Sequence, residues 1–201
     1  MTMLETERLT LRPWRMDDTA DAQALFTYAS SPDVGPAAGW QPHRSVAESA
    51  DIIRAVLSAP ETYAVVLKRT DEPIGSIGLQ KPCASVIGTP GYQTPALEIG
   101  YWIGKPYWGQ GLVPEAARAL LRHGFEDLDL QAVWGTHDME NAKSSRVMDK
   151  LGLRLVRVQP HVHMELLGDV WRDEAIRRIN SGRPESRMRW TEPMPRGHSS
   201  K

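Results

Sequence analysis

The chain has 201 residues, with 24 Lys plus Arg, 25 Asp plus Glu, and a formal net charge of −1 at pH 7. This length suits one substantial domain, and the balanced charge excludes the basic field of a typical nucleic-acid binder. A single cysteine, Cys83, excludes an intrachain disulfide and a multi-cysteine metal site. We find no apolar run of membrane-spanning length and no signal-peptide pattern, so we expect a cytoplasmic protein without a membrane partner.

The first elements follow from alternation and capping signals. Apolar residues alternate with polar ones over residues 4–14, which predicts a half-buried strand ended by Pro13. Asp17 and Asp18 then supply an N-cap signal for a helix through Tyr28. Residues 30–44 hold three prolines and two glycines, which indicates a loop.

A second helix begins at Ser45. Ser45 and Glu48 have the spacing of a capping box, in which each side chain satisfies the other residue's backbone amide. Apolar residues then recur at helical spacing as far as Leu57, and Pro60 ends the helix.

A hairpin and a long loop come next. Residues 63–69 and 74–80 have the apolar, β-branched composition of strands, and residues 70–73 form a turn between them. Residues 81–95 mix glycine, proline and small polar residues, so we expect a long loop that borders a substrate pocket.

The stretch from Leu97 to Ala117 is the most informative part of the chain. It predicts a strand, a tight loop with Gly109 and Gly111, and a helix in which Pro114 suits the first turn. Free amides at a helix N-terminus bind anions, and we expect this loop to hold a pyrophosphate. The third glycine of a dinucleotide fingerprint and the Lys-Ser or Lys-Thr of a P-loop are both missing here.

The rest of the chain alternates strands with helices. We predict strands over residues 132–136 and 153–158, separated by a helix over 141–151 that ends at Gly152. The pattern of residues 170–179 fits a strand or a helix equally well.

This order of elements predicts one α/β or α+β domain over residues 1–181. Residues 182–201 lack an apolar period, and we expect a flexible tail. Its arginines, Arg183, Arg187 and Arg189, fit a solvated basic segment.

Several segments together resemble the GNAT superfamily of acetyl-CoA-dependent N-acetyltransferases, in particular its RimJ/RimL-like branch. The resemblance spans about residues 4–180 and rests on Leu4–Arg12, Glu98–Ile103, Tyr107–Gly111, Glu115-Ala116 and Asn141–Gly152. It implies a three-layer α+β fold with a mixed, mostly antiparallel central sheet flanked by helices. It departs from the wider superfamily at Pro106, where Gln or Arg is common.

The resemblance also implies how acetyl-CoA binds. The strand ending near Ile103 would pair with the pantetheine arm, and backbone amides from Gly109 to Leu112 would hold the pyrophosphate. Asn141 and Ser144 would approach the thioester end. The cofactor-binding residues expected on this basis are Tyr101, Trp102, Ile103, Gly109, Gln110, Gly111, Leu112, Asn141 and Ser144.

The expected reaction is direct attack of a neutral primary amine on the thioester. An alkyl ammonium is mostly protonated at neutral pH, so a base must accept its proton, and the departing thiolate benefits from a proton donor. Glu98 is our candidate base, directly or through water, and Ser144 is the candidate donor. Glu98 also fits a solvated or ion-paired carboxylate, and Ser144 also fits a helix cap.

Other patterns leave alternatives open. Asp138 could orient the His137 imidazole as a general base, but the two residues fit a surface loop better. His161 and His163 lack a third metal ligand, so we expect no metal site. Trp102, Tyr107 and Trp108 fit packing residues, one of which could line the acceptor pocket.

The acceptor is a protein N-terminus or a small-molecule amine on this interpretation, with pocket walls from residues 32–43, 81–95 and 159–170. The sequence leaves open whether two copies of the chain form a homodimer. The alternatives are a non-catalytic CoA-binding sensor or interaction domain on the same fold, and a nucleotide-binding protein.

Overall fold

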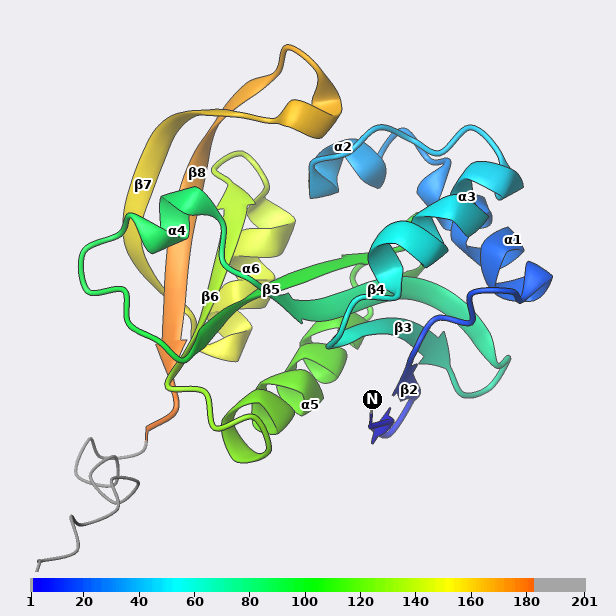
Figure 1. The fold of residues 1–201 in the computed structure, drawn as a ribbon, viewed down its shortest axis with the longest axis horizontal. Helices are drawn as coiled ribbons and strands as arrows, with labels where there is room; N and C mark the ends of the chain where they lie inside the picture. Colours follow the sequence, from blue (N-terminus) through cyan, green and yellow to red (C-terminus); the bar gives the residue numbers. More distant parts are fainter. Residues whose placement is uncertain (1, 183–201) are drawn as a thin grey trace, which may run out of the picture.

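A mixed eight-stranded sheet forms the middle layer of the computed structural model, which describes residues 2–182 (Figure 1). The strand order is β1-β2-β3-β4-β5-β6-β8-β7, and every neighbouring pair is antiparallel except β5 and β6. The expected mixed, mostly antiparallel sheet is therefore confirmed. The strands are β1 (Leu4–Glu5), β2 (Leu9–Arg12), β3 (Thr62–Leu67), β4 (Glu72–Gln80), β5 (Ala96–Ile103), β6 (Ala132–Asp138), β7 (Arg154–His163) and β8 (Trp171–Asn180).

Helices cover both faces of this sheet. They are α1 (Thr19–Ala29), α2 (Gly35–Ala38), α3 (Val46–Ile52) with the π-helical turn η1 (Ile53–Leu57), α4 (Ala84–Ile87), α5 (Leu112–Glu126) and α6 (Ala142–Leu151), with 3-10 turns η2 (Lys105–Tyr107) and η3 (Glu165–Leu167). The short helices α2 and α4 lie inside the two segments that the sequence predicts as loops. The predicted tail beyond Gly182, with Arg183, Arg187 and Arg189, lies outside the described residues.

The alternation of β3 produces two separate cores. Val65 belongs to the large cluster under α5 and α6, whereas Ala64 and Val66 belong to a smaller cluster under α1 and α3. Successive side chains of a strand point to opposite faces, so a single apolar strand serves both layers. No helix among residues 2–182 is long and apolar enough to cross a membrane.

Two local predictions need correction. The single strand expected over residues 4–14 is a hairpin of β1 and β2, because Thr6 turns the chain: its amide donates to the Leu9 carbonyl and its hydroxyl accepts from the Leu9 amide. The capping box is only half formed. The Ser45 hydroxyl accepts from the Glu48 amide, but the Glu48 carboxylate accepts from the amide of Arg44 rather than from that of Ser45.

The ambiguous segment 170–179 is strand β8, which pairs with β6 on one side and β7 on the other. Its pattern fits no simple period because it lies between two strands near the end of the sheet and is buried only around Ala175 and Ile176. This strand brings Arg172 and Glu174 alongside β6.

A buried ion pair fastens β2 to the first helix. Arg12 donates through both terminal nitrogens to Asp21, at 2.6 and 2.7 Å, and side-chain exposures are 7% and 2%. The Asp21 carboxylate also accepts from the Arg15 amide. Removing one member of such a pair leaves an uncompensated buried charge.

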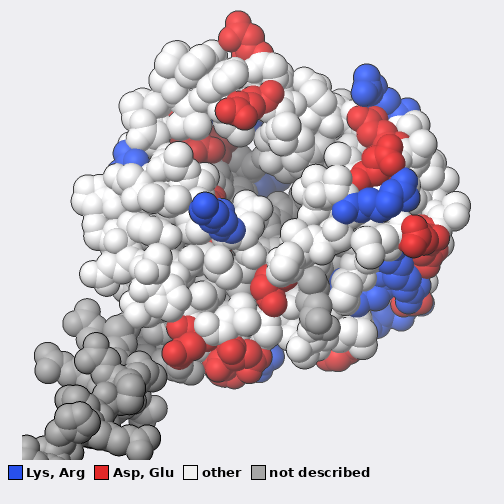
Figure 2. Space-filling view, viewed as in Figure 1, with Lys and Arg blue, Asp and Glu red and all other residues white. Residues whose placement is uncertain are grey.

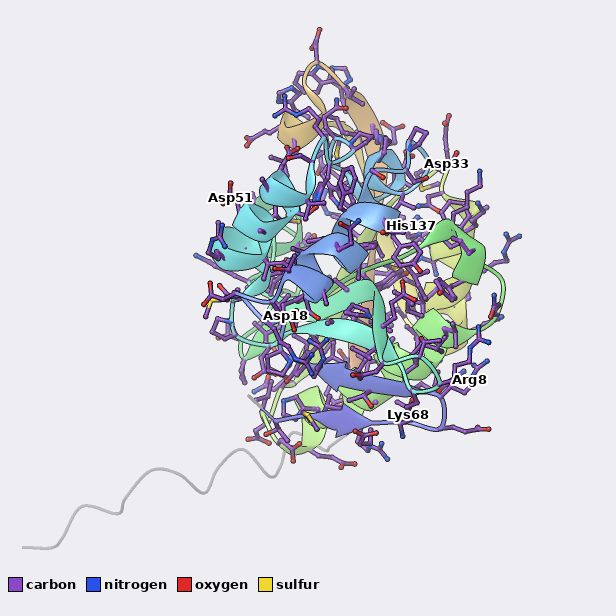
Figure 3. All side chains as sticks on the ribbon, turned by 90° about the vertical axis from the view of Figure 1, so that its right-hand side faces the viewer. Arg8, Asp18, Asp33, Asp51, Lys68 and His137 are labelled. Atoms are coloured by element: carbon purple, nitrogen blue, oxygen red, sulfur yellow. The ribbon has the colours of Figure 1, made fainter. Side chains whose placement is uncertain are left out.

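We therefore predict that Asp21→Ala lowers the free energy of unfolding by about 3–5 kcal/mol, measured by urea denaturation. The control is Asp51→Ala, which breaks the exposed ion pair between Asp51 on α3 (Figure 3) and Arg54. This substitution should change the free energy of unfolding by less than about 1 kcal/mol. Equal effects of the two substitutions would contradict a special role for Arg12–Asp21.

Candidate functional site

Within residues 2–182, the only parallel strand pair in the sheet separates part of the way along its length. β5 and β6 pair from Ala96–Ala132 to Glu98–Trp134, and no pairing between them continues beyond that point. β5 runs on to Ile103 with β4 as its one strand partner, and the Trp108 indole donates to the Ile103 carbonyl at the strand end, while β6 runs on paired with β8. The far end of β5 therefore keeps an unpaired backbone edge, which can accept an extended ligand as an added strand.

The loop after β5 presents a run of free backbone donors. The amides of residues 109–113 donate to no acceptor within residues 2–182, and the next amide hydrogen bond joins Glu115 to the Gly111 carbonyl. Gly109 and Gly111 have φ of 77° and 75°, a left-handed conformation that favours glycine. A Cβ at Gly109 would meet nothing within 4 Å, so the space beside these amides is open. Such a loop leading into α5 suits an anion.

Arg8 and Glu115 hold this loop in place. The Arg8 guanidinium donates to the Glu115 carboxylate at 2.6 and 2.7 Å and to the Gln110 carbonyl at 3.1 Å (Figure 3 labels Arg8). Glu115 also accepts from the Arg8 amide and the Thr6 hydroxyl, which keeps its pKa low despite partial burial. The turn between β1 and β2 therefore fixes the glycine loop from outside.

A cleft of about 410 Å³ follows the open edge of β5 from the glycine loop. Figure 2 shows a hollow near the middle of the face in view, with acidic and basic side chains interspersed around it. Eight of the nine predicted cofactor residues line the cleft, and Gln110 is the exception. The Gln110 side chain instead turns back to donate to the Pro106 carbonyl.

Two of the three segments expected to wall the pocket contribute to it. Val34 and Gly39 come from the 32–43 segment, and Met164 comes from the 159–170 segment. No residue of the 81–95 segment is among the lining residues within the described chain, so that expectation is wrong. This segment instead lies behind the cleft, where the Cys83 amide donates to Glu98.

Glu98 is 4% exposed, so a solvated carboxylate is excluded. Its Oε1 accepts from the Thr136 hydroxyl at 2.8 Å and its Oε2 accepts from the Cys83 amide at 2.9 Å. No ion pair with Glu98 occurs among residues 2–182, so the ion-paired alternative also fails. The carboxylate faces the cleft while held by two neutral donors.

Ser144 lies on the opposite face of β5 from Glu98. The Asn141 side chain, not Ser144, caps α6 by accepting from the Ser144 amide, so the capping alternative for Ser144 is wrong. The Ser144 hydroxyl instead lies 2.8 Å from the Tyr101 hydroxyl. Burial raises the pKa of Tyr101 to about 12, so this hydroxyl pair stays protonated near neutral pH. The role of the Tyr101 side chain was not foreseen from the sequence.

The histidine patterns have structural explanations. His137 and Asp138 end strand β6 rather than forming a surface loop, and His137 is 7% exposed. One ring nitrogen of His137 lies 2.8 Å from the Asp138 carbonyl and the other accepts from Arg177. Burial is the main cause of its lowered pKa, so the ring is neutral.

His161 and His163 both pack against the Trp171 ring. Within residues 2–182, no group of three or more His, Cys, Asp or Glu side chains is placed to hold a metal ion.

Sequence reasoning missed Glu174. This residue on β8 lines the cleft, and strand pairing sets it opposite Asp138. Burial raises the pKa of Glu174, and the negative charges of Glu98 and Asp138 add to the effect. No motif marks it, because its position depends on β8 lying beside β6 rather than on any local spacing.

Comparison with known proteins supports one family. Residues 8–154 match the family model for the acetyltransferase (GNAT) domain. A protein named uncharacterized N-acetyltransferase p20 from Bacillus licheniformis is 31% identical over 159 residues, which cover 77% of this chain and 83% of that protein.

Solved structures agree in fold. A GNAT-family acetyltransferase from Bacillus anthracis superposes with a TM-score of 0.74 at 24% identity, covering 90% of this chain and 99% of that one. The ribosomal-protein-S5-alanine acetyltransferase from Vibrio fischeri gives 0.68 at 17% identity, covering 90% and 98%. The family model spans most of the chain, so the chain belongs to the GNAT family of acetyltransferases.

Proposed function

We propose that this enzyme transfers the acetyl group of acetyl-CoA to a primary amine, either a protein N-terminal α-amine or a small-molecule amine. The observation that carries this proposal is the continuous cleft from the free amides of the glycine loop, along the open edge of β5, to Glu98. A RimJ/RimL-like relation favours a protein N-terminus, in keeping with the fold shared with a ribosomal-protein-alanine acetyltransferase.

The residues present fit acetyl-CoA. The free amides of residues 109–113 would hold the pyrophosphate, since they are fixed donors that need little reordering. The unpaired edge of β5 up to Ile103 would receive the amide-containing pantetheine arm. Acetyl-CoA supplies an electrophilic thioester carbonyl and a thiolate leaving group.

Protein groups on the two faces of β5 have separate proton-transfer tasks in this proposal. On one face Glu98, held by Thr136 and Cys83, would assist removal of a proton from the amine. On the other face Ser144, paired with Tyr101, would donate a proton to the departing sulfur. Both hydroxyls stay protonated near neutral pH, so the donor needs no further activation.

The function is tested by following thiol release from acetyl-CoA with a panel of peptides that differ in the N-terminal residue and a set of small amines. We expect release with at least one acceptor, together with a mass gain of about 42 Da on it. Binding of acetyl-CoA without release across the panel would indicate a CoA-binding sensor. No binding of acetyl-CoA at millimolar concentration by calorimetry would refute the proposal.

Replacement of Gly111 should weaken cosubstrate binding. In Gly111→Leu the side chain must adopt a left-handed backbone conformation at the amides that face the anion, so we expect the Kd for acetyl-CoA to rise about tenfold or more. The matched control is Gly152→Leu, because Gly152 has nearly the same backbone angles at the end of α6. An unchanged Kd in Gly111→Leu, measured by calorimetry, would contradict the proposed cradle.

Glu98→Gln should lower turnover and leave the Kd for acetyl-CoA nearly unchanged. The glutamine oxygen can still accept from the Cys83 amide, and its nitrogen can donate to the Thr136 hydroxyl, so the fold is preserved. We expect the rate of thiol release to fall about 100-fold, while Glu126→Gln, an exposed carboxylate on α5, has no effect. Unaltered turnover in Glu98→Gln would remove this residue from the chemistry.

A further inference from the structure

Three carboxylates face the acceptor end of the cleft, and they differ in how strongly the protein holds them. Glu98 has one hydrogen-bond donor on each oxygen. Asp138 accepts from the Glu140 amide and lies 3.3 Å from the Arg172 guanidinium. Glu174 makes no ion pair within residues 2–182, although its side chain lines the same cleft. The group that hydrogen-bonds it is the neutral Ser85 side chain.

The backbone fixes the position of Glu174 from both sides. β8 sets it opposite Asp138 of β6 and opposite Gln159 of β7, so it cannot leave the cleft by a simple loop movement. The groups that act on its carboxylate are Glu98 of β5, Asp138 of β6, Arg172 of β8 and Ser85 of α4. Arg157 of β7 donates to the Ser85 carbonyl.

We propose that Glu174 accepts the proton that the acceptor ammonium must lose, and that Glu98 assists this transfer by contacting and orienting the amine. This inference rests on the proposed function. The ammonium gives one proton to the Glu174 carboxylate, the free amine forms the C–N bond, and the C–S bond breaks. The second nitrogen proton then passes to the Ser144 hydroxyl as that hydroxyl gives its own proton to the departing sulfur, so the N–H and C–S bonds that break are matched by the C–N and S–H bonds that form.

The electrostatic surroundings favour this role. Burial raises the pKa of the Glu174 carboxyl, the nearby charges of Glu98 and Asp138 raise it further, and Ser85 and Arg172 oppose the rise only in part. A carboxylate with a raised pKa is a stronger base, and general-base catalysis is most effective when the pKa of the base lies near the working pH. Glu174 thus has the chemistry of a proton acceptor in the same cleft as Glu98.

The test compares Glu174→Gln, Glu98→Gln and the surface control Glu126→Gln in thiol release across a pH range, using an acceptor on which the wild-type enzyme is active. The rate constant kcat/KM of the wild type should rise with pH as Glu174 loses its proton. Glu174→Gln should lower kcat/KM about 100-fold and leave only the rise at higher pH that comes from deprotonation of the acceptor ammonium itself, whereas Glu98→Gln should lower the rate but keep the wild-type limb. The Kd for acetyl-CoA should stay unchanged in all three.

Two results would overturn the inference: a rising limb that persists in Glu174→Gln at the same pH as in the wild type, or one that is lost only in Glu98→Gln. Absence of thiol release by the wild type on every amine would instead refute the proposed function.

Folding is checked through the thermal midpoint. A raised folded-state pKa means that wild-type stability falls as the pH rises through that pKa. At about pH 8 the thermal midpoint of Glu174→Gln should therefore equal or exceed that of the wild type. The difference between the two midpoints should disappear at acidic pH, where the wild-type carboxyl is protonated. A lower midpoint at that pH would assign Glu174 a structural role and also count against the inference.

Discussion

The site depends on the separation of β5 from β6 after Glu98 and Trp134. A strand within a sheet normally has both edges hydrogen-bonded, and an unpaired edge in the middle of a sheet is costly unless water or a ligand satisfies it. Here β4 continues to hold one edge of β5 and β8 continues to hold β6, so the gap is kept open by the rest of the sheet. The cleft, the glycine loop at one end and the carboxylates at the other follow from this single break in pairing.

The alternation of side chains along β5 also places the two candidate catalytic residues, Glu98 and Ser144, on opposite sides of the strand. Glu98 and Trp102 face the side with Thr136 and Trp40, while Tyr101 faces α6 and contacts Ser144. In the proposed mechanism Glu98 and Ser144 serve different atoms of the reaction, the amine nitrogen and the departing sulfur. Positions of opposite parity on one strand keep them apart at a fixed distance, with the cleft running along the open edge of the strand.

Much of the fold was predictable because its signals are local. The caps at Asp18 and Ser45 and the left-handed Gly152 lie within one turn of the helices they bound, and each is confirmed. Other features need distant contacts. The strand at residues 171–180 and the burial of His137 depend on residues that are far away in the sequence. The sequence pattern alone could not decide them.

The sequence by itself determined the family resemblance, the glycine loop and the identity of Glu98 and Ser144 as candidates, because spacing within a strand, a loop and a helix is read directly from the chain. Only the tertiary structure decided which groups meet. It paired Ser144 with Tyr101, removed residues 81–95 from the cleft wall, and brought Glu174 beside Glu98. The physical reason is that pKa and reactivity depend on burial and neighbouring charge, and these are set by strands that pair across long separations in sequence.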